Sequence, residues 1–150
     1  MARPAKPLEQ DFKTIYMKKY LIKFLTAIVL CISIASCVNS PKSIIQATVN
    51  ASNKQCPQHL GNSLTCTNIE FDGFYVIYNY EDTDGSYMNQ DNVTPAKNNI
   101  IQTLKSQAQV DSSMKIFIDA LKKANVGIIY HYSAPGASMD VVIESIDLSV

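Results

Sequence analysis

Arginine is almost absent from this 150-residue sequence, since Arg3 is the single example and residues 37–150 contain none. That stretch holds seven lysines against eleven carboxylates, a net charge of −4, whereas residues 1–36 carry +4. Guanidinium forks and basic patches are the usual means by which proteins grip phosphate groups. The composition therefore argues against nucleic acid as a partner.

Histidine is also scarce, because only His59 and His131 are present. Nucleophilic hydrolysis needs a serine or cysteine beside a base that a carboxylate orients. Neither histidine lies in an elbow such as G-x-S-x-G. The sequence thus contains no catalytic signature, and we predict that the protein is not an enzyme. A hydrolase site assembled in space around one histidine is the alternative.

Candidate metal ligands are few, and only Cys56-x-x-His59 has a tolerable ligand spacing. The possible zinc ligands come from separate predicted elements: Cys56, His59, Cys66 and His131. Export would also favour oxidation of the two thiols. Residues 82–85, Asp-Thr-Asp-Gly, match part of a calcium loop, but Tyr80 and Asp91 stand where that loop needs carboxylate ligands. We expect no metal and no cofactor, and we interpret residues 82–85 as a solvated acidic turn.

The most informative stretch is residues 17–37, MKKYLIKFLTAIVLCISIASC. Three lysines lie near its beginning, residues 24–35 are an almost unbroken apolar run, and two small residues precede Cys37. These are the parts of a secretory signal. The apolar run is shorter than the roughly 20 residues that a membrane-spanning helix needs, which favours a cleaved signal over an uncleaved anchor.

Residues 34–37, Ile-Ala-Ser-Cys, resemble the lipobox of bacterial lipoproteins. The chain as a whole resembles the small lipoproteins of Gram-negative cell envelopes. The resemblance implies that Cys37 becomes the first residue of the mature chain and carries fatty acyl chains such as palmitate. It also implies location in the cell envelope, and Val38 after the cysteine implies sorting to the outer membrane. No activity comes with the resemblance.

The sequence divides at this signal. Residues 1–16 mix prolines and charges without periodicity, and we interpret them as a disordered extension or an over-long gene prediction. Residues 17–36 are the predicted signal peptide and 37–42 a polar tether. Residues 43–150 suit one small domain with a single core.

Two cysteines remain in the predicted exported domain, Cys56 and Cys66. One pair in an exported chain favours a disulfide. Closing so short a loop should stabilise the fold by about 2–3 kcal/mol in the chain-entropy picture. Two buried free thiols are the alternative.

A hairpin is the clearest local prediction. Alternating residues on either side of Asp72-Gly73 indicate two strands joined by a two-residue turn. That turn pairs Phe71 with Phe74, and the register then continues to Thr65 with Tyr80. One face is largely apolar and the other mostly polar, which is typical of an antiparallel sheet covered by helices on one side.

Helices are predicted before and after this hairpin. Ser40-Pro41 has the cap-then-proline pattern of a helix start, and this helix extends through Ala51. Thr94-Pro95 begins the next helix by the same logic. Asp111 or Ser112 interrupts it and caps a second segment, which stops at residues 125–127.

The remaining residues predict a second hairpin from strands 128–132 and 139–148. A bulge is expected near residues 144–145, where the alternation changes phase. The predicted fold is therefore α+β, a single small domain with an antiparallel sheet of two β-hairpins covered on one face by helices. The order of elements is α-ββ-α-ββ.

Aromatic residues provide the candidate binding face, which comprises Tyr75, Ile77, Tyr130 and Tyr132. Tyrosines that simply pack on the sheet are the alternative interpretation. We predict a membrane-tethered domain that binds an envelope protein or polymer, or acts structurally, without catalysis. The alternatives are a small envelope hydrolase and a small-ligand carrier, each using a cleft near His59 or His131.

Overall fold

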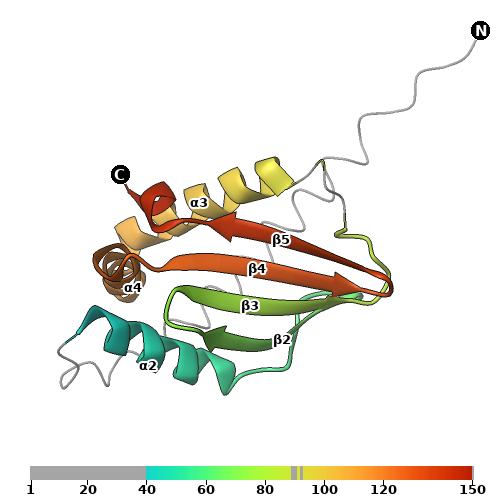
Figure 1. Ribbon diagram of the computed structural model, residues 1–150, viewed down its shortest axis with the longest axis horizontal. Helices are drawn as coiled ribbons and strands as arrows, with labels where there is room; N and C mark the ends of the chain where they lie inside the picture. The colour runs from blue at the N-terminus through green and yellow to red at the C-terminus, as the bar shows by residue number, and fades with distance from the viewer. Residues whose placement is uncertain (1–39, 89–90, 92, 150) are drawn as a thin grey trace, which may run out of the picture.

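A computed structural model describes residues 40–88, 91 and 93–149 (Figure 1). The predicted signal peptide and the lipidation residue Cys37 lie outside these residues. The elements are, in chain order, α2 Pro41–Asn53, β1 Gln58–His59, β2 Leu64–Phe71, β3 Tyr75–Asp82, α3 Val93–Val110, α4 Ser112–Ala124, β4 Gly127–Ala134, β5 Ala137–Ile143 and the 3₁₀ helix η3 Ser145–Leu148. The predicted α+β class and the alternation of helices with hairpins are confirmed.

The sheet is mixed and not wholly antiparallel, which corrects the prediction. Its five strands lie in the order β1-β2-β3-β4-β5, and β3 and β4 run parallel while the other neighbours are antiparallel. The reason is the long connection through α3 and α4, which returns the chain to the end at which β3 began. A parallel neighbour requires such a crossover.

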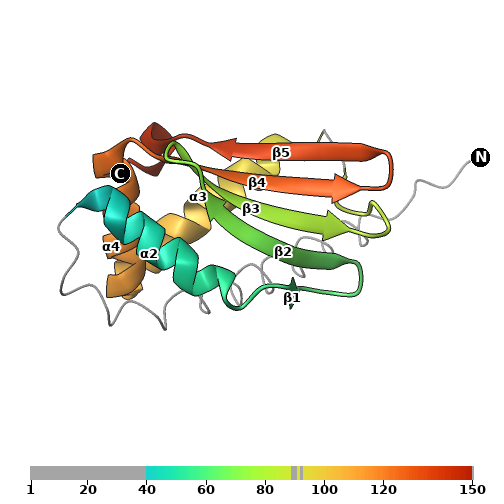
Figure 2. The same ribbon diagram turned by 60° about the horizontal axis from the view of Figure 1, so that its bottom comes forward.

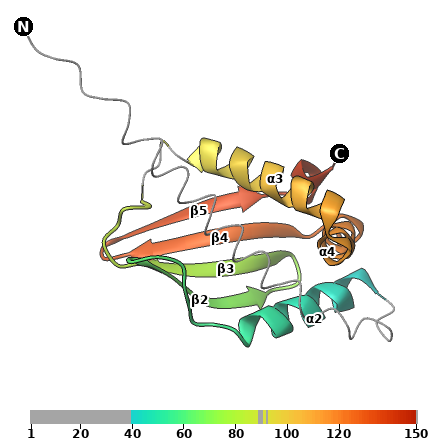
Figure 3. The ribbon, with the colours of Figure 1, turned by 180° about the vertical axis from the view of Figure 1, so that it is seen from behind.

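All three helices lie toward one face of the sheet. Figures 1 and 3 view it from opposite sides, and α3 lies behind β5 in one and in front of it in the other. The helix α2 packs along β2, α3 packs on β5, and α4 contacts both helices across one end of the domain. The opposite face of the sheet carries no helix in the described part of the chain (Figure 2).

Helices α2 and α4 begin where their caps predict, whereas α3 begins at Val93, so that Thr94 lies inside the helix. Ser40 Oγ accepts a hydrogen bond from Ser43 N at 3.2 Å, and Pro41 occupies the first turn of α2. Helix α2 therefore starts inside the stretch predicted to be a tether. At α4, the Asp111 carboxylate caps the amides of Ser113 and Met114, and Asn125 ends the helix in the left-handed conformation with φ 54°.

The β2–β3 turn is longer than predicted. Phe71 pairs with Val76 and not with Phe74. Asp72 Oδ1 accepts hydrogen bonds from the amides of Phe74 and Tyr75, at 2.8 and 2.7 Å, and thereby holds a wider loop. Phe74, predicted on the apolar face, is instead 72% exposed.

A bulge in β2 changes which of its residues face the core. The register shifts between Cys66 and Asn68, so that Thr67 is the extra residue. Leu64 and Cys66 consequently join the core, whereas the prediction placed Thr65 and Thr67 there. No bulge is needed near residue 144, because β5 ends at Ile143 and η3 follows.

The core lies between the inner face of the sheet and the helices. Its largest fully buried side chains are Phe117, Ile45, Ile69, Leu104, Met114, Leu121, Ile128, Ile143, Leu148, Val76, Val126 and Val141. The buried residues of each helix recur at the three- and four-residue spacing of an amphipathic face, as Ile45 and Val49, Ile100 and Leu104, and Met114, Phe117 and Leu121 show. This packing fixes the sheet and leaves its other face available to solvent.

Candidate functional site

The open face of the sheet carries a row of aliphatic side chains. The register places Ile77 of β3 beside Ile129 of β4, and Ile129 beside Val142 of β5. All three are partly exposed. Glu70 continues the row on β2. The result is an apolar strip that crosses β3, β4 and β5 on the face of the sheet without helices.

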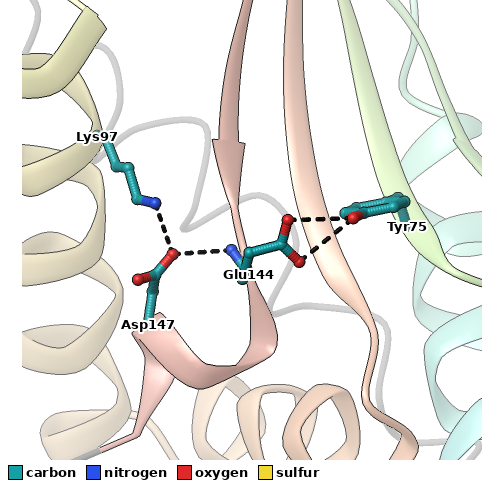
Figure 4. Close-up of polar contacts among 4 residues, drawn as sticks. All are labelled: Tyr75, Lys97, Glu144 and Asp147. Atoms are coloured by element: carbon teal, nitrogen blue, oxygen red, sulfur yellow. Dashed lines mark hydrogen bonds and ion pairs between the residues drawn. The ribbon is translucent and has the colours of Figure 1, made fainter.

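Tyr75 lies two residues before Ile77 on β3, in the row beside this strip, and is held in place. A Cβ atom added to Gly127 would lie 2.6 Å from Tyr75 Cε1, so the ring occupies the space that the glycine leaves. The Tyr75 hydroxyl donates to both carboxylate oxygens of Glu144, at 3.1 and 3.2 Å (Figure 4). This carboxylate raises the pKa of Tyr75. The ring is thereby fixed across β4.

Glu144 is in turn positioned by η3 and α3. Its backbone amide donates to Asp147 Oδ2 at 2.9 Å, and Lys97 Nζ lies 2.7 Å from the same oxygen (Figure 4). The hydrogen bond and charge of Lys97 lower the pKa of Asp147. Three residues from α3 and the C-terminal segment, Lys97, Asp147 and Glu144, thus support the tyrosine of β3.

A polar row lies beside the apolar strip. His131 Nδ1 and Asp140 Oδ1 are 2.5 Å apart on neighbouring strands, and both side chains are substantially exposed. Next to them, Asn79 Nδ2 donates to Glu70 Oε1 at 3.0 Å. The histidine therefore has an orienting carboxylate, although the pair lies on an open sheet face. Ser133, two residues further along β4, donates instead to the backbone of Tyr80.

His59 occupies a different part of the molecule. Its Nδ1 atom lies 2.9 Å from Thr65 Oγ1, across the short β1–β2 pairing. The two histidines are not brought together, and among the described residues no group of three potential metal ligands converges.

Tyr130 and Tyr132 do not belong to the open face, which corrects the predicted binding set. The parallel register places them beside Tyr78 and Tyr80 on the inner face. The four rings stack in one row, with centroid distances of 5.1 Å for Tyr78–Tyr130, 6.2 Å for Tyr130–Tyr80 and 5.0 Å for Tyr80–Tyr132. Burial raises the pKa of each of these hydroxyls. Their role is packing, and Tyr75 and Ile77 remain as the predicted surface residues.

Cys56 and Cys66 are neighbours in space. Their Sγ atoms lie 3.9 Å apart as free thiols, with Cys66 buried and Cys56 partly exposed. Burial raises the pKa of both thiols. The two sulfurs are close enough that a small movement would bring them to the roughly 2.05 Å of a disulfide, which stays a prediction.

Asp82 is buried, so the interpretation of residues 82–85 as a solvated turn is wrong for this residue. Its Oδ2 atom accepts from the Tyr87 amide at 2.8 Å. Burial and the nearby Asp84 raise its pKa, whereas hydrogen bonds from Ser86 lower the pKa of Asp84 to about 2. No sequence pattern predicts this burial, because the loop that covers Asp82 is formed by the residues after it.

No protein-family model matches the sequence, and the comparison with curated proteins also finds no match. The fold is similar to the crystal structure of a "putative secreted protein" from Pseudomonas aeruginosa, with a TM-score of 0.55. The two chains are 7% identical, and the similarity covers 73% of this chain and 93% of the other. At this identity the likeness concerns the fold alone.

No helix within residues 40–88 and 93–149 is both long and apolar enough to span a bilayer. The class that emerges is a small α+β domain with one helix-covered face and one open sheet face. The open face is its candidate site.

Proposed function

We propose that this protein is a lipid-anchored protein of the bacterial cell envelope whose domain binds a partner protein through its open sheet face, without catalysis. The observation that carries the binding role is the apolar strip formed by Ile77, Ile129 and Val142, with Tyr75 fixed beside it. Contiguous apolar surface on a soluble domain marks an interaction site. A flat face of this kind suits a protein surface better than a small ligand, which needs a concave pocket.

The fixed tyrosine strengthens this proposal. Tyrosine is enriched at interface centres because it offers a large contact area with few rotatable bonds. Gly127 and Glu144 already restrict the ring of Tyr75 before any partner arrives. Binding would therefore cost less side-chain entropy than ordering a free side chain.

Anchoring rests on the sequence. The signal-like residues 17–36 end in the lipobox-like Ile-Ala-Ser-Cys, and two or three acyl chains on Cys37 would hold the protein on a membrane essentially permanently. Val38 favours the outer membrane. Similarity in fold to a protein described as secreted is in line with an extracytoplasmic location.

Acylation is tested by mass spectrometry of the mature N-terminus. The expected product begins at Cys37 and carries the added mass of a diacylglyceryl group, and Cys37→Ser should remain an unprocessed precursor. A mature chain without lipid, or a serine variant that matures and fractionates like the parent, would contradict the anchoring.

Docking is tested by site-specific photo-crosslinking in intact cells. A benzophenone side chain at position 142, on the strip, should form a discrete protein adduct that Tyr75→Ala and Ile77→Asp both reduce. The same group at Gln102, exposed on α3, is the matched control. Adducts of equal yield at both positions would refute the binding face. So would an adduct at position 142 whose yield neither substitution reduces.

A hydrolase is the second candidate, and the His131–Asp140 pair is the observation that favours it. A carboxylate beside a histidine fixes its tautomer and orientation, as a general base requires. Hydrolysis of generic ester or peptide substrates by the wild type, abolished in both His131→Ala and Asp140→Asn, would establish it. Activity that survives either change would exclude this pair.

A further inference from the structure

Large apolar side chains are exposed at one end of the domain. Among the described residues, four stand out: Phe74 at 72% exposure, Val110 at 87%, Ile116 at 42% and Ile146 at 74%. They belong to the β2–β3 loop, the junction of α3 with α4, α4 itself and η3. Figures 1 and 3 show these segments together at the end of the molecule opposite the β4–β5 turn.

The first turn of α2 lies at this same end. Lys42 Nζ donates to the Gly73 carbonyl at 3.0 Å and lies 5.6 Å from the centroid of the Phe74 ring. The Gly127 amide, just after α4, donates to the Phe74 carbonyl at 3.0 Å. These contacts connect the start of the domain to the β2–β3 loop and to α4.

Connectivity then limits how far this end can lie from Cys37. Only residues 38–40 separate Cys37 from the first residue of α2, Pro41. Because an extended chain spans at most about 3.6 Å per residue, the two lie within roughly 15 Å of each other. Acyl chains on Cys37 would therefore hold this end of the domain next to the bilayer surface.

Exposed lysines accompany the apolar side chains at this end. Lys42, Lys115 and Lys123 are exposed there. The nearby carboxylates keep their negative charge, but each has a partner within the protein: Asp72, Asp111, Asp119, Glu144 and Asp147. Exposed lysines beside apolar side chains are typical of surfaces that lie in the headgroup region, where the ammonium groups meet lipid phosphates.

We propose that this end is a membrane-contacting surface, with Phe74, Val110, Ile116 and Ile146 seated in the boundary between headgroups and acyl chains. The inference rests on the proposed acylation of Cys37. It sets the orientation of the domain, because the strands would then run away from the membrane. The open sheet face would stand to the side, where a partner can reach it.

The absence of tryptophan from the sequence permits a direct test. Phe74→Trp places a single reporter at this end, and Ala137→Trp places one on an exposed residue at the opposite end. Each variant, as the complete mature lipoprotein, is inserted into phosphatidylethanolamine–phosphatidylglycerol vesicles with and without brominated acyl chains. Tryptophan at position 74 should shift to the blue and lose about half of its emission or more to the bromines, because the headgroup–acyl boundary is within their reach. Tryptophan at position 137 should do neither.

The outcomes separate this inference from the anchoring on which it rests. Acylated protein, verified by mass, whose Phe74→Trp emission matches that of Ala137→Trp would overturn the membrane-contacting surface and leave the anchor intact. A blue shift without bromine quenching would mean that the end contacts protein, such as a second copy, and would also overturn it. Failure of acylation would contradict both the lipid anchor and the membrane-contacting surface. Circular dichroism of each variant confirms folding.

Discussion

The ring of Tyr75 occupies the space that Gly127 leaves open, so that a residue of β3 reaches across β4 to Glu144 beyond the end of β5. The relationship requires glycine for steric reasons alone. An added Cβ would lie 2.6 Å from Tyr75 Cε1 and 2.8 Å from the Ile143 carbonyl oxygen. The tyrosine could rotate away, but the backbone carbonyl belongs to a paired strand.

Gly127→Ala should therefore destabilise the domain by about 1–3 kcal/mol, the usual cost of overpacking a buried position. Urea unfolding followed by circular dichroism measures the change. Gly61→Ala is the control, because its Cβ would meet nothing closer than Tyr87 Oη at 3.9 Å. Equal unfolding midpoints for the two variants would show that the close approach is not a constraint.

The pair Cys56 and Cys66 leads to a prediction about redox state. In an oxidising compartment the two thiols should form a disulfide, because their sulfurs lie 3.9 Å apart. The mature chain should then lose the mass of two hydrogens and be stabilised by about 2–3 kcal/mol relative to its reduced form. Under mild reduction, maleimide should modify the partly exposed Cys56 before the buried Cys66. Full alkylation of both residues in protein freshly isolated without reductant would contradict the disulfide.

What the sequence could predict was local. The cap Ser40 could be predicted, and the cap of α4 could be narrowed to Asp111 or Ser112, because a cap and the amides it satisfies lie within three residues. The β2–β3 register was missed because the Asp72 side chain widens the loop and the bulge at Thr67 shifts the strand. The parallel direction of β4 relative to β3 could not be predicted, because it depends on the end of the sheet at which α4 ends.

In the candidate site, too, local features could be predicted and those that depend on strand pairing could not. Tyr75 and Ile77 were placed on the open face because strand alternation needs no partner. Tyr130 and Tyr132 were misassigned because their face depends on pairing with Tyr78. The His131–Asp140 contact could have been found, since a two-residue turn at positions 135–136 places these residues opposite each other.

The buried Asp82 predicts a pH-dependent change in stability. Its folded-state pKa is raised above 3.8, so the wild type loses stability as the pH rises through 3.8 toward that pKa. Asn at this position can still accept from the Tyr87 amide and can donate to Asp84. Asp82→Asn should thus be more stable than wild type at pH 7, and the difference should vanish below about pH 4.

Asp84 should behave in the opposite way and is the control for this experiment. Its pKa is lowered to about 2, so its contribution is present above pH 3.8 and is lost as the pH falls toward 2. Asp84→Asn should therefore destabilise the protein at pH 7. Urea midpoints of both variants across the pH range measure the two effects. A neutral-pH loss of stability in Asp82→Asn would contradict the assignment.

The cap of α4 gives the last prediction. Asp111 Oδ1 accepts from the amides of Ser113 and Met114, at 2.8 and 3.1 Å, and its charge lies at the positive end of the helix dipole. Asp111→Ala should cost about 1 kcal/mol of unfolding free energy. Asp119→Ala, in the same helix, removes only a 4.0 Å surface ion pair with Lys122 and should change stability by less than about 0.5 kcal/mol. Because both variants remove one carboxylate, a difference between their urea midpoints isolates the capping hydrogen bonds from net charge, and identical midpoints would rule out a stabilising cap at α4.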